Sequence, residues 1–539
     1  MEKLLGKGVY KAIAIGKLQY FRHEHDRVEK CMVTDTEGEI LRFHQTLQKA
    51  IVELDQLYEK ALKEVGEEDA QIFQIHRMML EDEEFTGEVE RAIRENHVNA
   101  EYAVKTTAEV TEQALAAMDD GYLQYRTADI KEVFGNLVGH LTGKKKEELC
   151  LKQPVILAAD DLSPSETMKL DKSKILAFIT AQGSSNSHTA ILARSMNIPA
   201  VVAIGDGLRK DCSGKNAVVD GERGEVFLEP DSATLRKYSE KQENQEEEAR
   251  ELEKLRGLDN VTRNGKRVRI YANVGNLSDV QAALQHDAGG IGLFRSEFIF
   301  LGRDSLPTEE EQFEIYKQAL RGMPGKEVII RTLDIGADKQ ADYLEMPGEQ
   351  NPAMGCRAVR LCLTRPELFK TQLRALYRAS VYGKLLVMFP MITSVQEVKD
   401  CKQLAKEVRE GLRAQNIPFD PNVPLGIMVE TPAAALVSGK LAGEADFFSI
   451  GTNDLTQYTL AIDRQNSALE RFFNPHHPAV LELIRITVEN AHRHGIWTGI
   501  CGELGADESL TRFFLDIGVD ELSVSSSRIL SLRKTVREL

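Results

Sequence analysis

The second half of the chain contains eight short apolar, β-prone runs, and a stretch with helical periodicity follows each of them. Eight strand-then-helix units in a row are typical of a (β/α)8 barrel, a parallel sheet that closes on itself inside a ring of helices. The runs cover residues 268–274, 290–294, 328–333, 385–390, 425–429, 447–450, 496–500 and 521–524. We therefore predict a TIM-like barrel over residues 261–539, with an extra excursion between the third and fourth strands.

The first half has a different pattern. Residues 36–145 lack strand signals and carry long helical periodicities, as in Leu47, Ile51 and Leu54, which predicts a helical bundle. Short β-prone pieces lie before it, at 8–15, and after it, at 155–158, 175–180, 217–219 and 226–228. We expect residues 1–35 and 146–230 to form one α/β domain into which the bundle is inserted, and the charged segment 231–260 to be a linker helix.

Composition limits the partners and the compartment. A chain of 539 residues should divide into two or three domains, and its net charge of -16 disfavours binding to nucleic acid. No run of about 18 apolar residues predicts membrane insertion, and the first residues lack the apolar core of a signal peptide. Seven scattered cysteines do not indicate a disulfide framework. We expect a cytoplasmic protein.

One histidine stands where a polar loop becomes a helix. In residues 183–202, GSSNSHTAILARSMNIPAVV, small and hydroxylated residues precede His188, and apolar residues recur after it. The free N–H groups of a new helix favour an anion near the imidazole, so His188 is a candidate phosphoryl acceptor. The alternative from these residues alone is a serine-rich N-cap before an amphipathic helix with a partly buried histidine.

Polar side chains follow the predicted barrel strands, where active sites of such barrels lie. Arginines there could clamp phosphate and carboxylate oxygens, and carboxylates could hold Mg²⁺. The candidate arginines are Arg295, Arg331, Arg357 and Arg464, the candidate carboxylates are Glu430 and Asp454, and Asn273, Asn453 and Cys501 end other strands. Taken singly, each charged residue has a surface ion pair as its alternative, and Cys501 has a small buried core cysteine.

The motifs together resemble the family of phosphoenolpyruvate-dependent phosphotransferases, and most closely its enzyme I group from the bacterial sugar phosphotransferase system. Besides 183–202, the matching motifs are GLFRSEF at 292–298, RTLDIGADK at 331–339, NPAMGCRAVR at 351–360, GIMVETP at 426–432, SIGTNDLTQY at 449–458 and CGE at 501–503. They occur in the family's order and cover nearly the whole chain.

The resemblance assigns roles to these residues. It implies a phosphohistidine at His188, a proton donor at Cys501 and a threonine, Thr167, that orients the histidine; a helix cap is an equal alternative for Thr167. It implies that phosphoenolpyruvate and Mg²⁺ bind at the strand ends. The substrate-binding residues are expected to be Arg295, Arg331, Arg357, Asn453, Asp454 and Arg464, and the metal ligands Glu430 and Asp454.

The resemblance also implies partners. The phosphoryl group would pass to the phosphocarrier HPr, which docks on the inserted bundle, as the first step of sugar uptake. Apolar residues beside acidic clusters at 67–84 suit a basic partner. The family usually works as a homodimer through its barrel. The chain ends at Leu539, soon after the eighth strand, and we expect this to weaken barrel closure or the dimer.

Four positions depart from the commonest family pattern: Ser184, Asn186, Ala337 and Gln465. They replace small or polar residues and leave the reactive groups intact, so we expect effects on rate and loop geometry.

Two other functions compete with this one. Pyruvate phosphate dikinase and phosphoenolpyruvate synthase share the phosphohistidine domain and the barrel, but they need an ATP-binding domain that this sequence lacks. A signalling or scaffold protein that only senses phosphoenolpyruvate is the alternative from another class. Intact Glu430, Asp454 and Cys501 count against it, because a sensor need not keep metal and proton-transfer groups together.

Overall fold

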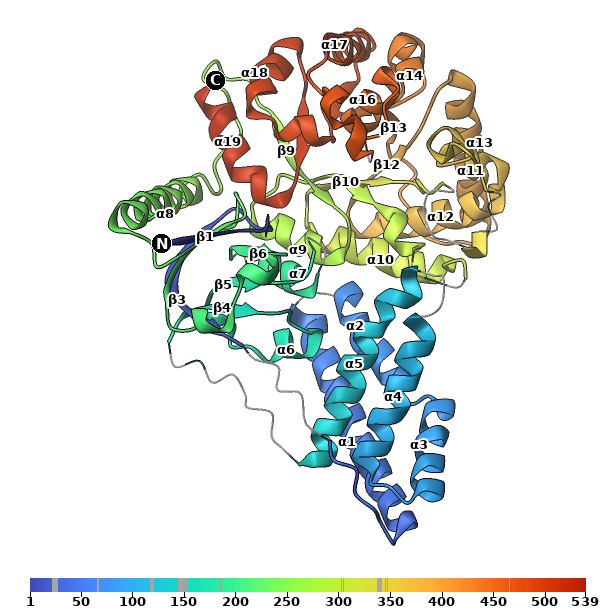
Figure 1. Cartoon of the computed structure of the whole chain (residues 1–539). Coiled ribbons are helices and arrows are strands. Elements are labelled where there is room, and N and C mark those ends of the chain that lie inside the picture. The colour runs from blue at the N-terminus through green and yellow to red at the C-terminus, as the bar shows by residue number, and fades with distance from the viewer. Residues whose placement is uncertain are drawn as a thin grey trace. The chain divides into compact units, whose positions relative to one another are not determined.

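The computed structural model describes the chain except for residues 22–27, 65–66, 117–120, 144–150, 152, 185–186, 197, 302, 304, 337–341, 345, 347 and 465. The described part divides into two compact units, Met1–Glu248 and Ala249–Leu539. Each unit has its own sheet (Figure 1). In the described part, no helix is both long enough and apolar enough to cross a bilayer.

A helical bundle forms part of the first unit, as the periodicity of this segment predicts. Its helices bury one apolar face each, and Phe43, Val89 and Leu137 are almost fully buried between them. The helices are α1 (Thr36–Glu64), α2 (Glu67–Leu80), α3 (Glu83–Asn96), α4 (Ala100–Ala116) and α5 (Gly121–Thr142). Asp82 caps α3 by accepting a hydrogen bond from the Phe85 amide.

The rest of the first unit is an eight-stranded sheet with the order β1-β8-β7-β3-β4-β5-β6-β2. Strands β3 to β6 run parallel, and the remaining pairs are antiparallel. The strands are β1 (Glu2–Leu5), β2 (Lys7–Gly8), β3 (Ile13–Tyr20), β4 (Val155–Ala159), β5 (Ile175–Thr180), β6 (Ala200–Val202), β7 (Asn216–Asp220) and β8 (Glu225–Leu228). Helices α6 (Pro164–Lys169) and α7 (His188–Met196) connect the parallel strands.

The first predicted strand, 8–15, is wrong in its bounds. The chain bends after Gly8, where the Ala12 amide donates to the Tyr10 carbonyl, and the long strand β3 starts only at Ile13. A Cβ at Gly8 would stand 2.3 Å from the Gly221 carbonyl oxygen, so this close approach admits only glycine. A single apolar run therefore supplies two strands with different partners.

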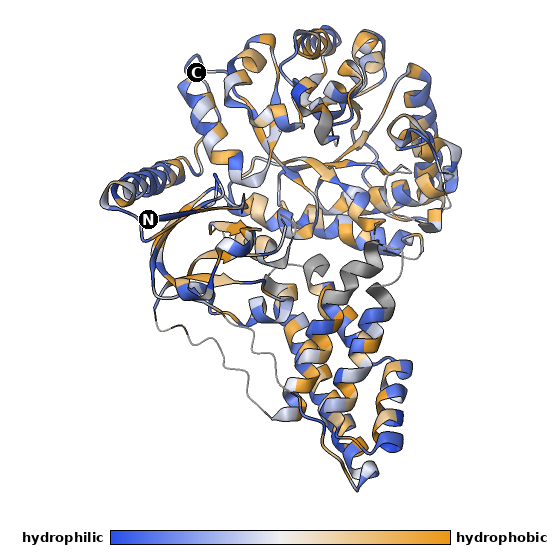
Figure 2. Ribbon diagram, viewed as in Figure 1, coloured by the Kyte–Doolittle hydropathy of each residue, from blue (hydrophilic) through white to orange (hydrophobic). Residues whose placement is uncertain are grey.

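Helix α8 (Ser232–Glu253) follows the sheet. Tyr238 is its one buried residue among those described, and its hydroxyl donates to Glu225 over 3.0 Å. Lys241 also bonds Asp220 at 2.9 Å, so the first turns of α8 are held on β7 and β8. The remaining turns are mostly hydrophilic, as Figure 2 shows.

The second unit is a closed barrel of eight parallel strands, as predicted. Three strands have the predicted bounds and the others differ by one or two residues at an end. They are β9 (Arg269–Val274), β10 (Ile291–Arg295), β11 (Glu327–Arg331), β12 (Lys384–Phe389), β13 (Leu425–Val429), β14 (Phe447–Ile450), β15 (Trp497–Ile500) and β16 (Glu521–Val524). Strand β16 pairs with β9 at four positions, so the weakened closure expected from the short C-terminal segment is wrong.

Helices surround the barrel and bury their apolar faces against the outside of the strands. The predicted excursion lies between β11 and β12 and carries α11 (Val359–Thr364) before α12 (Pro366–Ala379). The other helices are α9 (Leu277–Gln285), α10 (Glu309–Gly322), α13 (Val395–Ala414), α14 (Pro432–Leu436), α15 (Ser438–Leu441), α16 (Thr452–Leu460), α17 (Pro478–Arg493), α18 (Glu508–Ile517) and α19 (Ile529–Glu538).

Candidate active site

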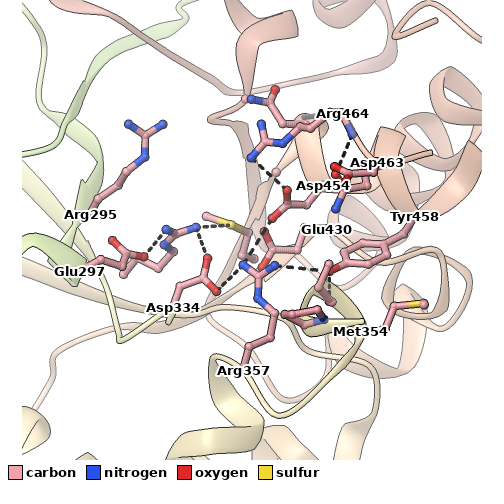
Figure 3. Close-up of a pocket in the computed structure, with 18 of the residues that line it drawn as sticks. Arg295, Glu297, Asp334, Met354, Arg357, Glu430, Asp454, Tyr458, Asp463 and Arg464 are labelled. Atoms are coloured by element: carbon pink, nitrogen blue, oxygen red, sulfur yellow. Dashed lines mark hydrogen bonds and ion pairs between the residues drawn. The ribbon is translucent and has the colours of Figure 1, made fainter. Parts of the chain in front are cut away.

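A pocket of about 820 Å³ opens at the C-terminal ends of the barrel strands. Because all eight strands are parallel, residues that directly follow them converge on this one face. The pocket is lined by eight of the residues predicted from the sequence: Arg295, Arg331, Arg357, Glu430, Asn453, Asp454, Arg464 and Cys501. Figure 3 shows most of them around the pocket.

Two of these arginines are buried and share one carboxylate. Arg331 ends β11 and lies 2.9 Å from Asp334, and Arg357, in the excursion, lies 2.8 Å from the other oxygen of the same side chain. Arg331 also bonds Glu297, which follows β10. Burial acts to lower the pKa of Arg331, but the carboxylates of Glu297 and Asp334 outweigh it and keep the guanidinium charged.

Each of the two buried arginines has one N–H group that its ion pairs do not use. Within the described residues, the Nε atoms of Arg331 and Arg357 are buried and make no hydrogen bond. Both guanidinium groups stay charged and line the pocket, so an anionic ligand there would be attracted to them. Arg331 and Arg357 are therefore the best-formed anion site on this face.

The carboxylates of Glu430 and Asp454 lie beside the arginines (Figure 3). Glu430 directly follows β13, is 1% exposed, and accepts a hydrogen bond of 2.6 Å from the Met391 amide. Burial, together with the charges of Asp454 and Asp334, raises the pKa of Glu430 to about 8. Such crowding of carboxylates in a buried place is what a divalent cation relieves, and hard oxygen donors are those that Mg²⁺ prefers. The residues present fit Mg²⁺.

The remaining predicted arginines are exposed at the pocket mouth. Arg295 ends β10 and makes no contact with the buried cluster in Figure 3. Arg464 lies 3.4 Å from Asp454, and its side chain is 37% exposed. Both guanidinium groups can reach a ligand without first breaking a buried ion pair.

Cys501 and Asn453 complete the pocket. Cys501 follows β15, is buried, and its thiol donates to the Ile450 carbonyl at 3.7 Å. Burial raises the pKa of this thiol to about 12, so it carries its proton at neutral pH. Asn453, in the first turn of α16, exchanges two hydrogen bonds with Glu503, of 2.9 and 3.1 Å, which fix its amide.

Sequence reasoning missed Glu297, Asp334 and Tyr458 as parts of the site. Asp334 holds both buried arginines, and Tyr458 contacts Arg357 at 3.5 Å. A signal was present for Asp334, because a carboxylate three residues after a strand-ending arginine can reach back to it. Tyr458 is distant in sequence from Arg357 and gave no such signal.

His188 and Thr167 lie in the first unit. Helix α7 begins at His188, whose side chain is outside the described residues, and Ser187 caps the helix by accepting from the Ala190 amide at 3.4 Å. Thr167 is buried in α6, and its hydroxyl donates to the Pro164 carbonyl at 2.8 Å. This bond leaves the lone pairs of the hydroxyl free to accept another donor.

The loop before His188 turns at Gly183, whose φ of 101° is a conformation that favours glycine. Ser184 is exposed in this loop, and its carbonyl accepts a hydrogen bond of 3.1 Å from the Ser187 amide. The other three departures from the family pattern, Asn186, Ala337 and Gln465, lie outside the described residues.

Comparisons with known proteins cover the whole chain. Residues 249–539 match the model of the PEP-binding domain of PEP-utilising enzymes, residues 5–126 the N-terminal region of these enzymes, and residues 151–224 their mobile domain. The chain is 41% identical to the phosphoenolpyruvate-protein phosphotransferase of Bacillus subtilis, covering 100% of this chain and 95% of the relative. The relatives in Staphylococcus carnosus and Haemophilus influenzae carry the same name and are 40% and 41% identical, over 100% and 98% of this chain and 94% and 92% of theirs.

Proposed function

The chain belongs to the family of phosphoenolpyruvate-protein phosphotransferases, and we propose that His188 is the residue that accepts the phosphoryl group, which then passes to the phosphocarrier HPr in sugar uptake. The observation that carries this proposal is the pair of buried arginines that share Asp334 and keep unpaired Nε donors within the described residues. Phosphoenolpyruvate has a phosphate and a carboxylate, which match two fixed cations at the bottom of a pocket.

Arg295, Arg464 and Asn453 would contact the same ligand from the mouth, where Arg464 also lies 3.4 Å from the proposed metal ligand Asp454. Glu430 and Asp454 would hold Mg²⁺ with oxygens of the substrate and water. In the described part of the chain no cluster of three or more metal-ligating side chains exists, so the substrate has to supply part of the coordination. When bound, Mg²⁺ would neutralise charge on the phosphoryl oxygens.

The proposed reaction has two steps. The neutral imidazole of His188 attacks the phosphorus, the bond from phosphorus to the enol oxygen breaks, and the enolate of pyruvate remains in the pocket. The arginines bind the charge that the leaving oxygen gains. Cys501 then gives its proton to the methylene carbon of the enolate, which forms pyruvate. The raised pKa of Cys501 supports this role, because a donor must hold its proton until the carbanion forms.

His188 has to reach the barrel pocket and then a second protein. We place it on an α/β domain formed by 1–35 and 146–230, separate from the bundle at 36–145 and from the barrel at 261–539. The segment 231–260 would act as a hinge. Its helix α8 supports this assignment, since Tyr238 and Lys241 hold the first turns on the sheet and the remaining turns are mostly hydrophilic. Thr167 would accept a hydrogen bond from the histidine ring.

HPr would dock on the bundle along 67–84. The side chains of 67–69 are outside the described residues, but Met78 is 69% exposed and Glu81, Glu83 and Glu84 are exposed beside it. An apolar residue rimmed by carboxylates suits a basic partner. His76 is fully buried, which supports a packing role over a second phosphorylation site.

A homodimer through the barrel and a cytoplasmic location belong to the same proposal. The family resemblance supports the homodimer; Leu436 and Phe472 of the barrel unit expose 66% and 52% of their surfaces and are candidates for contact with a partner subunit. Light scattering on the purified protein would measure its mass in solution.

Intact-mass measurement tests the central step. The pure protein and its His188→Ala variant would be incubated with phosphoenolpyruvate and Mg²⁺, without ATP. We expect an acid-labile gain of about 80 Da, one phosphoryl group, in the wild type only, and its discharge when HPr is added. A mass gain in both proteins would show that a residue other than His188 is phosphorylated. A gain in neither protein would refute the phosphotransferase proposal and favour a phosphoenolpyruvate sensor.

A further inference from the structure

A carboxyl group lies inside the barrel, beneath the pocket, where such barrels normally pack branched apolar side chains. Glu521 of β16 is 0% exposed, and neither of its oxygens makes a hydrogen bond with any described residue. The hydroxyl of Ser523, two residues further along the strand, is equally buried and also has no hydrogen bond in this part of the structure. Burying such groups costs free energy, and neither the Glu521 carboxyl nor the Ser523 hydroxyl has a role in the phosphoryl transfer proposed above.

Two glycines make the room for this carboxyl. A Cβ at Gly499 would stand 1.8 Å from Oε2 of Glu521. A Cβ at Gly292 would stand 2.2 Å from Oε1 of Glu521 and 2.5 Å from Oγ of Ser523. The register of β10 shifts around Gly292, which brings this glycine to the inside of the barrel. The carboxyl and the Ser523 hydroxyl therefore face the same space.

The strand register connects this space to Cys501. Ser449, Gly499 and Glu521 pair across β14, β15 and β16 and form one inward row. Cys501 follows Gly499 by two residues, so it lies on the same face, one layer nearer the pocket, about 7 Å along the strand direction. Ser523 follows Glu521 by two residues and reaches the same layer as Cys501. The Ser449 hydroxyl faces the thiol and partly offsets the rise that burial causes in its pKa.

We propose that Glu521 is a proton-relay residue that acts through Cys501, returning a proton to the thiol by way of the Ser449 and Ser523 hydroxyls. The inference rests on the proposed role of Cys501 as the proton donor to the enolate. After that step the cysteine is a thiolate. At rest these hydroxyls make no hydrogen bond within the described residues. When a hydroxyl turns to lie between the sulfur and the Glu521 carboxyl, it gives its proton to the sulfur and takes one from Glu521, so the S–H bond is restored and Glu521 becomes a carboxylate. Glu521 then takes a proton from water at the N-terminal end of the barrel, where its row neighbour Arg269 is 40% exposed.

The protonation states agree with this direction of transfer. Burial raises the pKa of Glu521 to about 8; Arg269 opposes the rise, and the Glu327 and Asp520 carboxylates add to it. Glu521 therefore mostly carries a proton at pH 7. The thiol of Cys501, with a pKa of about 12, is the weaker acid, so a thiolate there takes the proton from Glu521.

Deuterium incorporation measures this relay directly. Enzyme, Mg²⁺, phosphoenolpyruvate and pyruvate would be mixed in D₂O without HPr, so that phosphoryl transfer runs in both directions. Each reversal returns a methyl proton to Cys501, and deuterium enters the vinyl positions of phosphoenolpyruvate only when the thiol exchanges with solvent. Proton NMR follows the loss of the vinyl signals, while single-turnover mass measurement follows phosphorylation of His188.

For Glu521→Gln we expect deuterium incorporation to fall at least about tenfold while the single-turnover rate stays within about threefold of wild type, because the amide keeps the shape but holds no transferable acid proton. Incorporation within twofold of wild type would overturn the relay. Loss of phosphorylation in the wild type itself would instead refute the proposed function.

If Glu521→Gln does not fold, variants of the two serine hydroxyls test the same relay. Ser449→Ala combined with Ser523→Ala should slow incorporation and spare single-turnover phosphorylation. Thr498→Val is the matched control: its hydroxyl is also buried without a hydrogen bond in the described structure, but Thr498 alternates with Gly499 and lies on the outer face of β15. Equal incorporation in the double variant and in Thr498→Val would overturn the hydroxyl route.

Discussion

The barrel pocket and the start of helix α7 differ in the interactions that hold their side chains in place. In the pocket, Arg331 and Arg357 form buried ion pairs of 2.9 and 2.8 Å with Asp334, and Arg331 also pairs with Glu297. The helix that begins at His188 has nine residues, and its Ala190 amide donates a cap bond of 3.4 Å to the Ser187 hydroxyl. The pocket residues are therefore fixed by buried charge, whereas the helix that begins at the proposed phosphoryl acceptor is held by apolar packing, with Leu192 and Ala193 in the core of the first unit.

The largest effect should come from breaking the fixed cluster. Arg357→Ala removes one buried cation and leaves Asp334 with a single arginine, so kcat/KM for phosphoenolpyruvate should fall about 10³-fold, or about 4 kcal/mol. Single-turnover phosphorylation at varied substrate concentration measures it. Arg374→Ala is the control, because Arg374 pairs with Glu309 at 2.7 Å away from the pocket. Equal losses in the two variants would show that the shared carboxylate has no special role.

A smaller effect should follow removal of the thiol. Cys501→Ser should keep phosphorylation of His188 within a few-fold of wild type, while on-enzyme formation of pyruvate slows about 10²-fold, because a hydroxyl is a weaker proton donor. Rapid quench with separate assays of phosphoprotein and pyruvate distinguishes the two steps. The buried Cys401 on α13 provides the control as Cys401→Ala, which should leave the ratio of the two rates unchanged. If Cys501→Ser slowed both steps equally, its role would be packing.

Glu53 should make the stability of the first unit depend on pH. Hydrogen bonds from His140 and Lys169 lower the pKa of Glu53 to about 2, below the value of about 4.3 for an unfolded chain. Their stabilisation is therefore complete above about pH 4.3 and is lost as the pH falls towards 2. Glu53→Gln should lower the unfolding free energy by about 1 kcal/mol at pH 7 and by less at pH 3.

Calorimetry over this pH range checks the prediction for Glu53. Glu444→Gln, which removes longer pairs of 3.6 and 3.8 Å to Lys399 and Lys402, should affect only the barrel. A loss for Glu53→Gln that stayed constant between pH 7 and pH 3 would rule out the assigned titration.

The smallest effects compare a helix cap from each region. The Ser394 hydroxyl caps α13 by accepting from the Glu397 amide, and the Ser394 amide donates back to the Glu397 carboxylate, so Ser394→Ala should cost about 1 kcal/mol. Three residues after Ser187 the chain has Ala190, whose side chain cannot accept a reciprocal bond, so Ser187→Ala should cost about 0.5 kcal/mol or less. Denaturant unfolding measures both. A larger cost at Ser187 would mean that the start of α7 is as firmly held as the barrel helices.

The barrel was predictable because its strands are buried on both faces and appear as short apolar runs that end at polar residues. Those endings also predicted the pocket, from Arg331 to Cys501. The clustering of Arg331 and Arg357 on one carboxylate was not predictable, since it depends on how the excursion folds over the strand ends. The burial of Glu521 was also not predictable. Glu521 is the first residue of a predicted strand, and only the closed barrel shows that two glycines on other strands leave room for its side chain.

The Asp334 carboxylate has an evolutionary consequence. Because each of its oxygens is bound by a different arginine, no one of the three residues can be replaced without leaving a buried charge short of a partner. A single substitution at any of these three positions should therefore lower both the stability of the protein and its affinity for the substrate. The three positions should therefore behave as one inherited unit, which changes together or does not change.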